Sequence, residues 1–202
     1  GLTPKGRKLL ESGRERIYRP ASDAAWDGRW SVIVFSVPEA RRRLRDALRV
    51  RLSWLGCGLL TSGAWISPHD VRAEVLEIAA ELKLARNVEI FRGEHLAHSS
   101  PERLVAQCWD LAGLDRRYAA FIARWSREFE HCSQCGMTGA RAGIHKPCTA
   151  PADCFRRRFL LVHEYRAFPL EDPLLPGPLL PAGWNGKAAA RLFETYHDAL
   201  AG

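Results

Sequence analysis

The stretch WSVIVFSVPEARRRLRDALRVRLSWLG, residues 30–56, decides the fold class of this chain. Residues 30–37 are an apolar run rich in β-branched side chains and stopped by Pro38, which predicts a buried strand. Residues 39–55 have helical periodicity, because leucines and an alanine recur on one face while arginines occupy the others. Gly56 and Gly58 then end the predicted helix. The apolar face comprises Leu44, Ala47, Leu48, Leu52 and Leu55.

The following residues extend this unit. GLLTSGAWISP, residues 58–68, is typical of a hairpin with strands at 58–60 and 64–67 and a Ser62-Gly63 turn. A second amphipathic helix and a strand at 87–91 come next. The order β-α-β-β-α-β predicts an α+β fold of the split-βαβ, ferredoxin-like kind, with two helices on one face of a sheet. The apolar residues of the second helix are Val71, Val75, Ile78, Ala79 and Leu82.

The rest of the chain is predicted to be helical. A helix opens at Ser100-Pro101-Glu102 and reaches about residue 111, and Gly113 is expected to separate it from a longer helix with a wide apolar stripe. After an insert with cysteines, a helix is expected at 155–166. The segment PLEDPLLPGPLLPAGWNG, residues 169–186, has too many prolines for regular structure, so an extended wrap anchored by Trp184 is predicted. A closing helix opens at Asn185-Gly186.

Charge and composition limit the class of protein. The 202 residues are 47% hydrophobic and carry a formal net charge of +7, with arginine clusters at residues 41–45 and 156–158. This balance favours polyanionic partners, either DNA or a phosphate-bearing small molecule, although each cluster could equally be a solvated helix face. No apolar run is long enough to cross a bilayer and no signal-peptide pattern is present, so a cytoplasmic location is expected.

Six cysteines divide into two groups. Cys57 and Cys108 are isolated in apolar surroundings, whereas Cys132, Cys135, Cys148 and Cys154 cluster in a Gly/Pro-rich segment. In a chain expected to be cytosolic, such a cluster indicates metal before disulfides, and four thiolates could close a structural zinc tetrahedron. His145 could replace Cys148 or Cys154 as a ligand. Free surface thiols and a redox-sensing pair remain alternatives.

FRRRFLLVHEYRAFPLEDPLLPGPLLPAGWNGKAAARLFETY, residues 155–196, resembles the C-terminal signature of the PaaX family, the bacterial repressors of phenylacetate-degradation genes. The middle of the chain resembles the central domain of the same family, so the resemblance covers nearly all residues. The matching C-terminal positions are His163-Glu164-Tyr165-Arg166, Asp172-Pro173, Leu175-Pro176, Leu180-Pro181, Trp184, Gly186 and Ala188. The matching central positions are Trp30, Pro38-Glu39, Leu55-Gly56, Gly58 and Gly63-Ala64-Trp65-Ile66-Ser67-Pro68.

The resemblance implies three domains: a winged helix-turn-helix, a ferredoxin-like dimerisation domain, and a helical domain with the proline-rich wrap. Residues 1–20 match the end of the first, residues 21–98 the second, and residues 99–202 the third, with the cysteine-rich insert at 131–154. The chain is therefore expected to begin after the recognition helix, as a remnant of the winged-helix domain. Candidates for phosphate contacts to DNA are Lys5, Arg7, Arg14 and Arg16, with a solvated linker as the alternative.

The resemblance also implies a mechanism. Such a repressor is a homodimer that leaves its operator DNA when an aryl-acyl-coenzyme A effector binds, phenylacetyl-coenzyme A in the best-known members. The effector would need cations for its phosphates and an apolar pocket for its acyl end. Candidate effector-binding residues are Arg41, Arg45, Arg166 and Trp184. For the last two a structural role is the alternative, with Arg166 paired to Asp172 and Trp184 holding the wrap.

Two other classes of function compete with the repressor hypothesis. A ferredoxin-like unit also builds the nuclease-like subunit of CRISPR adaptation, but that enzyme needs an acidic residue at the end of its first strand, and Val34-Phe35-Ser36-Val37-Pro38 has none. No known catalytic motif is present, so no catalytic residue is proposed and a non-enzyme is expected. His163, beside Glu164, is expected to be a buried structural histidine. The other competitor is a ligand-free dimeric scaffold or coregulator.

Overall fold

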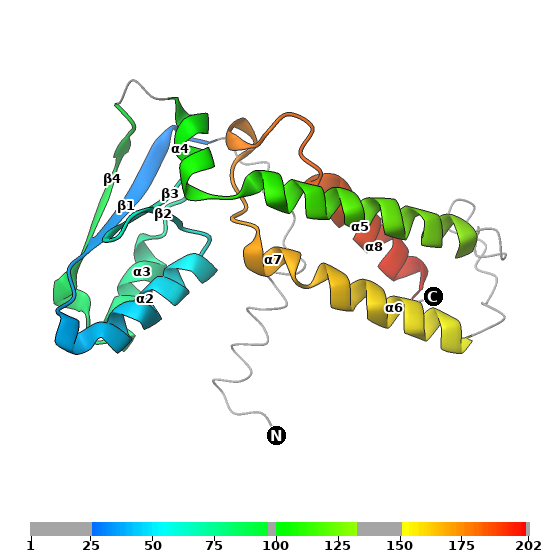
Figure 1. Ribbon diagram of the computed structural model, residues 1–202, viewed down its shortest axis with the longest axis horizontal. Helices are drawn as coiled ribbons and strands as arrows, with labels where there is room; N and C mark the ends of the chain where they lie inside the picture. The colour runs from blue at the N-terminus through cyan, green and yellow to red at the C-terminus, as the bar shows by residue number, and fades with distance from the viewer. Residues whose placement is uncertain (1–25, 97–99, 133–150, 201–202) are drawn as a thin grey trace. The chain divides into compact units, whose positions relative to one another are not determined.

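The computed structural model describes residues 26–96, 100–132 and 151–200, and these residues form two compact units (Figure 1). The sheet unit contains the described residues of 22–111 together with Glu171–Pro181. The helical unit contains the described residues of 112–170 and 182–202. The sheet unit thus continues past residue 98, where the sequence placed a domain boundary, and takes a segment of eleven residues, 171–181, from the proline-rich region.

The sheet unit is built on four antiparallel strands in the order β2-β3-β1-β4. The strands are β1 (Arg29–Phe35), β2 (Gly58–Thr61), β3 (Ala64–Ser67) and β4 (Val88–Glu94). Strand β1 lies between β3 and β4, with Ile33 opposite Trp65 on one side and opposite Ile90 on the other. This sheet and the helical C-terminal part confirm the predicted α+β class. Strand β4 reaches Glu94, beyond the predicted residue 91, because it pairs with β1 along seven residues.

Two helices, α2 (Arg42–Trp54) and α3 (Arg72–Glu81), cover one face of this sheet (Figure 1). Helix α2 is preceded by a 3-10 turn, η1 (Glu39–Arg41), and a second turn, η2 (Ala85–Asn87), leads from α3 into β4. Because side chains alternate along a strand, Ile33 and Phe35 of β1 point to the same face as the buried side chains of both helices. The core residues from the helices and the residues beside them are Leu48, Leu52, Val71, Val75, Ile78, Ala79 and Leu84.

Helix α4 (Pro101–Cys108) lies against β2 and ends earlier than predicted. Its N-cap Ser100 accepts a hydrogen bond from the Arg103 backbone N–H. The break comes at Trp109, whose backbone is extended and whose indole Nε1 donates to the Gly56 carbonyl at 3.1 Å. Gly113 was predicted to separate the helices and this was wrong, because Trp109 fixes the break and Gly113 lies inside the next helix.

The helices of the helical unit are α5 (Leu111–Cys132), α6 (Pro151–Tyr165), α7 (Phe168–Glu171) and α8 (Gly186–Ala199). The first residue of α5 and the last residue of α7 are assigned to the sheet unit. The core of the helical unit is largely aromatic: Tyr118, Phe121, Trp125, Tyr165, Phe168, Phe193 and Tyr196. None of the helices in the described part of the chain has both the length and the apolar character of a membrane span.

The composition of the proline-rich region predicted no regular structure there, and this prediction was wrong. Helix α7 forms there, and a 3-10 turn, η5 (Gly177–Leu179), lies in the segment that joins the sheet unit. Pro169 and Pro178 occupy the second residue of these short elements, where a missing backbone N–H costs no intrahelical hydrogen bond. Prolines in the first turn therefore leave the few hydrogen bonds of these short elements intact.

Candidate functional site

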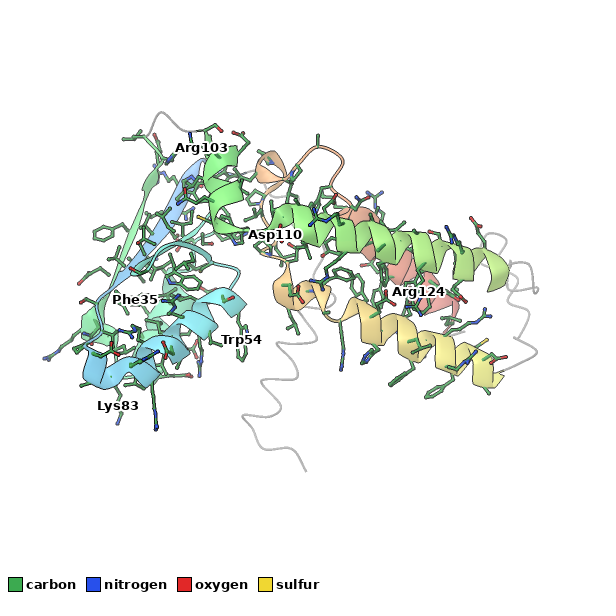
Figure 2. All side chains as sticks on the ribbon, in the orientation of Figure 1. Phe35, Trp54, Lys83, Arg103, Asp110 and Arg124 are labelled. Atoms are coloured by element: carbon green, nitrogen blue, oxygen red, sulfur yellow. The ribbon has the colours of Figure 1, made fainter. Side chains whose placement is uncertain are left out.

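The predicted effector arginines at the start of α2 are already bound within the sheet unit. Arg41 donates from Nη2 to the Lys83 backbone carbonyl at 2.8 Å, and Arg45 pairs through Nη1 with Glu39 Oε2 at 2.9 Å. Figure 2 labels Lys83, which follows α3 at the end of the unit where α2 begins. These contacts tie η1 and α2 to the turn after α3. An anion at this helix start would have to share both guanidinium groups with their present partners.

We call residues 171–181 the strap. The strap begins with a turn that a side-chain hydrogen bond stabilises. Asp172 is buried, and its Oδ1 accepts a hydrogen bond from the Leu174 backbone N–H at 2.7 Å. Leu174 has a φ of 54°, a left-handed conformation that is uncommon for leucine. Gly56, at φ 81°, lies so close that a Cβ atom there would be 3.0 Å from the Pro173 carbonyl oxygen. Glycine is thus required at residue 56 both by its backbone conformation and by the strap.

A polar cluster of the sheet unit also contacts the strap, through a hydrogen bond from His69. His69 Nε2 lies 2.9 Å from the Leu174 carbonyl oxygen, and since a carbonyl only accepts, Nε2 carries the proton. Ser67 Oγ accepts from the His69 backbone N–H at 3.1 Å, and Ser31 Oγ donates to the His69 carbonyl at 2.7 Å. Arg92 donates from Nη1 to Ser31 Oγ at 3.1 Å. The two buried serines therefore fix the position of the His69 backbone.

Asp27 completes this cluster at the surface. Its Oδ2 lies 2.8 Å from Arg92 Nη2, and its Oδ1 accepts from the Arg29 backbone N–H at 3.0 Å. These hydrogen bonds, first that from the Arg29 backbone and then that from Arg92, lower the pKa of the Asp27 carboxyl below its ordinary value of 3.8. No member of the cluster was predicted from the sequence to be a functional residue. The available signal was the pair of serines inside apolar strands, at residues 31 and 67.

Trp184 has structural contacts in the helical unit. Its ring lies edge-on to Tyr118, with centroids 5.6 Å apart, and a Cβ atom at Gly186 would be 2.4 Å from its Nε1. Next to it, the Asn185 backbone N–H donates to Asp115 Oδ1 at 2.8 Å. These contacts hold the start of α8 against α5, which is consistent with the structural alternative considered for this tryptophan.

Arg166 and His163 lie on the exposed side of the chain around the end of α6. The prediction of a buried His163 was wrong: it is exposed and stacks on Phe159, with ring centroids 6.1 Å apart. Its neighbour Glu164 points elsewhere, because Oε2 accepts from Trp125 Nε1 at 3.0 Å and pairs with Arg124 Nη1 at 2.9 Å. Figure 2 labels Arg124 on α5, on the side facing α6. The exposed Arg166 belongs to the helical unit, whereas Arg41 and Arg45 belong to the sheet unit.

The predicted metal and DNA residues fall largely outside the described residues. Cys135 and Cys148 lie in the undescribed range 133–150, Cys132 is described only as the last residue of α5, and Cys154 is a partly exposed residue of α6. Lys5, Arg7, Arg14 and Arg16 all lie in the undescribed range 1–25. Burial raises the pKa of Cys57 to about 12 and that of Cys108 to about 11, so these two thiols remain neutral.

Comparison with known families assigns both halves of the chain. Residues 23–105 match the PaaX protein central Cas2-like domain, and residues 109–202 match the PaaX-like protein C-terminal domain. The chain belongs to the PaaX family. It is similar to the transcriptional repressor PaaX of Escherichia coli (strain K12), with 30% identity over 203 residues that cover 99% of this chain and 60% of the repressor. The chain thus spans less than two thirds of that relative.

A solved structure shares the fold. The uncharacterized protein Rv0674 from Mycobacterium tuberculosis superposes with a TM-score of 0.61 at 22% identity, over 99% of this chain and 71% of that protein. The similarity therefore extends through both compact units. At this level of identity it concerns the fold alone.

Proposed function

We propose that the chain is the effector-sensing part of a PaaX-type transcriptional repressor. In the complete protein, this part would control the binding of a winged-helix domain to operator DNA upstream of genes for the catabolism of phenylacetate or related aromatic acids. The observation that carries the proposal is the 30% identity to the Escherichia coli repressor over 99% of this chain. The matches to the central and the C-terminal family domains, which follow each other along the chain, support it. A regulator rather than an enzyme, a homodimer and a cytoplasmic location are parts of this proposal.

We also propose that the sheet unit is ferredoxin-like. The strand order β2-β3-β1-β4, the antiparallel pairing and the crossover helices α2 and α3 support this arrangement. A nuclease of Cas2 type is the competing function for such a unit. Strand β1, with the sequence RWSVIVF, has no carboxylate that could hold a metal ion, which favours the regulator.

The proposed effector is an aryl-acyl-coenzyme A, with phenylacetyl-coenzyme A as the first compound to test. Calorimetry of the purified chain should show saturable binding of phenylacetyl-coenzyme A that is tighter than binding of coenzyme A and of phenylacetate alone. No heat of binding with phenylacetyl-coenzyme A or with other aryl-acyl thioesters would contradict the effector proposal and favour a ligand-free scaffold.

Variants can identify which cations bind the phosphates. Arg41→Ala and Arg45→Ala should weaken effector binding if the start of α2 holds the anion, and Arg103→Ala on α4 is a matched control at an exposed arginine of the same unit. Trp184→Phe tests the helical unit in the same way. If all these variants bind as the parent chain does, the effector site lies on other residues.

We retain structural zinc as a proposal for Cys132, Cys135, Cys148 and Cys154. Four thiolates suit tetrahedral zinc, which would link the end of α5 to α6. Elemental mass spectrometry of the purified chain should find one zinc per chain, retained after desalting and lost to a strong chelator together with the appearance of reactive thiols. A zinc content near zero in protein purified without chelators would contradict it.

A further inference from the structure

The first turn of the strap contains a residue in an unfavourable backbone conformation. Leu174 has a φ of 54°, and such a left-handed value brings the Cβ atom of a non-glycine residue too close to the following carbonyl oxygen. Two hydrogen bonds hold Leu174 there: its N–H donates to Asp172 Oδ1 at 2.7 Å, and its carbonyl accepts from His69 Nε2 at 2.9 Å. Without these bonds leucine favours a negative φ, so the turn has two distinct arrangements available to it.

A continuous chain of hydrogen bonds leads from this turn to the start of β1. Ser31 Oγ donates to the His69 carbonyl at 2.7 Å and accepts from Arg92 Nη1 at 3.1 Å. Arg92 Nη2 then lies 2.8 Å from Asp27 Oδ2. Ser31 is 1% exposed, so the bonds in the middle of this chain are shielded from water. We call the following five residues the relay: Leu174, His69, Ser31, Arg92 and Asp27.

The relay ends in a tight turn before β1. Asp27 Oδ1 accepts from the Arg29 backbone N–H at 3.0 Å, and Trp26 Nε1 donates to the Arg29 carbonyl at 3.1 Å. Gly28, between them, has a φ of 76°. In the chain this turn follows residues 1–20, which the sequence assigned to the end of the winged-helix domain. The conformation of the turn therefore sets the direction in which the chain enters β1.

We propose that the strap is a latch with two positions, and that the relay couples the position of the latch to the turn before β1. In the latched position, which the structure shows, Leu174 is left-handed and binds His69. In the released position Leu174 has a negative φ, its carbonyl turns away, and His69 Nε2 loses its acceptor. Because Ser31 binds the His69 carbonyl, a shift of His69 also disturbs the contact between Ser31 and Arg92.

This latch would link a bound effector to the DNA-binding part of the complete protein. Both ends of the strap continue into the helical unit, at residues 170–171 and 181–182. A ligand that binds one strap position better than the other would therefore also bias the turn before β1. This role in repression rests on the proposed function, whereas the coupling itself is a property of this chain.

Release of the latch is local. Leu175 and Leu179 are buried, so apolar packing keeps the rest of the strap on the sheet unit. Leu174 is only half-buried, and hydrogen bonds of its own N–H and carbonyl hold it. Segments with few buried apolar contacts open at a lower free energy than the folded core. Exchange of backbone amide protons can therefore detect the release without unfolding of the whole unit.

The first test changes one leucine of the strap at a time. Leu174→Ile conserves volume, but a β-branched side chain disfavours the left-handed conformation further, so this variant should favour release. Leu175→Ile is the matched control, because Leu175 does not have a positive φ. Amide exchange measured by NMR should give a protection factor at position 174 that falls about tenfold in Leu174→Ile and less than about threefold in Leu175→Ile. An equal loss in both variants, or a loss in neither, would overturn the two positions.

The second test measures transmission along the relay. Leu174→Ile should also lower the protection of the Arg29 amide, at the far end, by at least about threefold. In a Ser31→Ala background the same substitution should lower protection at position 174 alone, because the relay is cut. Ser67→Ala is the control background. Ser67 is as buried as Ser31 and binds the His69 N–H, but it takes no part in the relay, so transmission should persist.

A further pair of variants cuts the relay at the surface, in case Ser31→Ala does not fold. Arg92→Met removes the guanidinium between Ser31 and Asp27, and it should also confine the effect of Leu174→Ile to the strap. Arg103→Met is its control, because the Arg103 guanidinium binds no group in the described part of the chain. Transmission should persist in Arg103→Met, and its loss there would contradict the relay.

The outcomes separate the latch from the proposed function. Faster exchange at position 174 with unchanged protection at Arg29 would show a strap without coupling and would overturn the proposal. An equal loss of protection at Ile33, in the middle of β1, would show global unfolding and would overturn it as well. Calorimetry with phenylacetyl-coenzyme A tests the effector independently: binding by a chain with uncoupled amides would overturn the latch and leave the effector standing. Coupled amides in a chain that binds no acyl thioester would support the latch and contradict the effector.

Discussion

The sheet unit and the helical unit use different chemistry to fill their interiors. The sheet core is mainly aliphatic, with Ile33, Leu48, Leu52 and Val75 fully buried. The helical core is mainly aromatic, with Tyr165 stacked on Phe193 at 3.9 Å and Tyr118 stacked on Phe168 at 4.2 Å between ring centroids. Aliphatic chains can repack around a small change, whereas a network of contacting rings transmits it. We therefore expect the helical unit to tolerate core changes less well.

Polar groups show the same contrast. In the helical core, Trp125 donates its indole N–H to Glu164, and the Tyr196 hydroxyl donates to the Glu128 carbonyl at 3.4 Å. In the sheet core, the buried Trp65 indole N–H has no hydrogen-bond partner among the described residues. The helical unit thus pairs these two ring donors with a carboxylate and a backbone carbonyl, and the sheet unit depends on strand register and apolar packing.

The largest expected effect comes from removing a ring of the aromatic core. Phe193→Ala should lower the free energy of unfolding by about 3–5 kcal/mol, because the cavity would lie beside Tyr165 and the neighbouring rings could not collapse into it. Leu48→Ala in the sheet core is the comparison, with an expected loss of about 2–5 kcal/mol. Urea denaturation followed by circular dichroism measures both. A smaller loss in Phe193→Ala than in Leu48→Ala would contradict the difference drawn between the two cores.

The next effect tests close packing on the sheet. A Cβ atom at Gly58 would be 2.7 Å from both the Cys108 Cβ and the Trp109 ring, whereas one at Gly93 would meet nothing within 4 Å. Gly58→Ala should therefore cost about 1–3 kcal/mol through overpacking, and Gly93→Ala, also in a strand, should change stability very little. Thermal unfolding of the two variants checks this. Equal melting temperatures would mean that α4 does not pack on β2 as described.

A smaller effect should separate the two tryptophans. Trp125→Phe removes a hydrogen bond to a carboxylate and should cost about 1–2 kcal/mol beyond the loss of ring area. Trp65→Phe removes a similar ring area without breaking a hydrogen bond, so it should cost less. Glu164→Gln keeps an acceptor for Trp125 and serves as a control. Denaturation that finds Trp65→Phe the more damaging change would contradict the role given to the Glu164 contact.

The smallest expected effect is a pH dependence at Asp27. Because its folded-state pKa lies below the ordinary value of 3.8, the carboxylate stabilises the folded chain above that pH, and this contribution is lost as the pH falls through the folded-state pKa. The stability difference between the parent chain and Asp27→Asn should be constant above about pH 5 and should shrink toward acid. Denaturation at several pH values measures it. A difference that grows toward acid would reverse the assigned sign.

Local patterns predicted the elements of both units well. The buried strand at 30–37, the hairpin with its Ser62-Gly63 turn and the final helix from Gly186 each depend on periodicity and on turn residues that are adjacent in sequence. The helix break was misplaced at Gly113 because the true cause lies far away in the chain. Trp109 ends α4 through contacts with Gly56 and Trp30, and no local pattern encodes those partners.

The candidate sites were harder to predict than the fold. The arginines of residues 41–45 stood out by composition, but the Lys83 carbonyl that binds Arg41 could not be inferred from spacing. The contact from His69 to Leu174 joins residues 105 positions apart. The exposure of Phe159 could not be predicted, because the sequence around it is typical of an ordinary amphipathic helix. Only the packing of α6 shows which of its apolar residues face outward.

The strap makes the two halves of this chain inseparable by a single cut. Within the described residues, the polypeptide crosses between the units three times, at residues 111–112, 170–171 and 181–182. A fragment cut at the family boundary near residue 105 would lose the segment that covers Gly56 and accepts the hydrogen bond from His69. Exposed backbone and unmet donors would then promote aggregation in a piece that looks autonomous by homology. A fragment designed to express the sheet unit should therefore include residues 171–181 in the same chain.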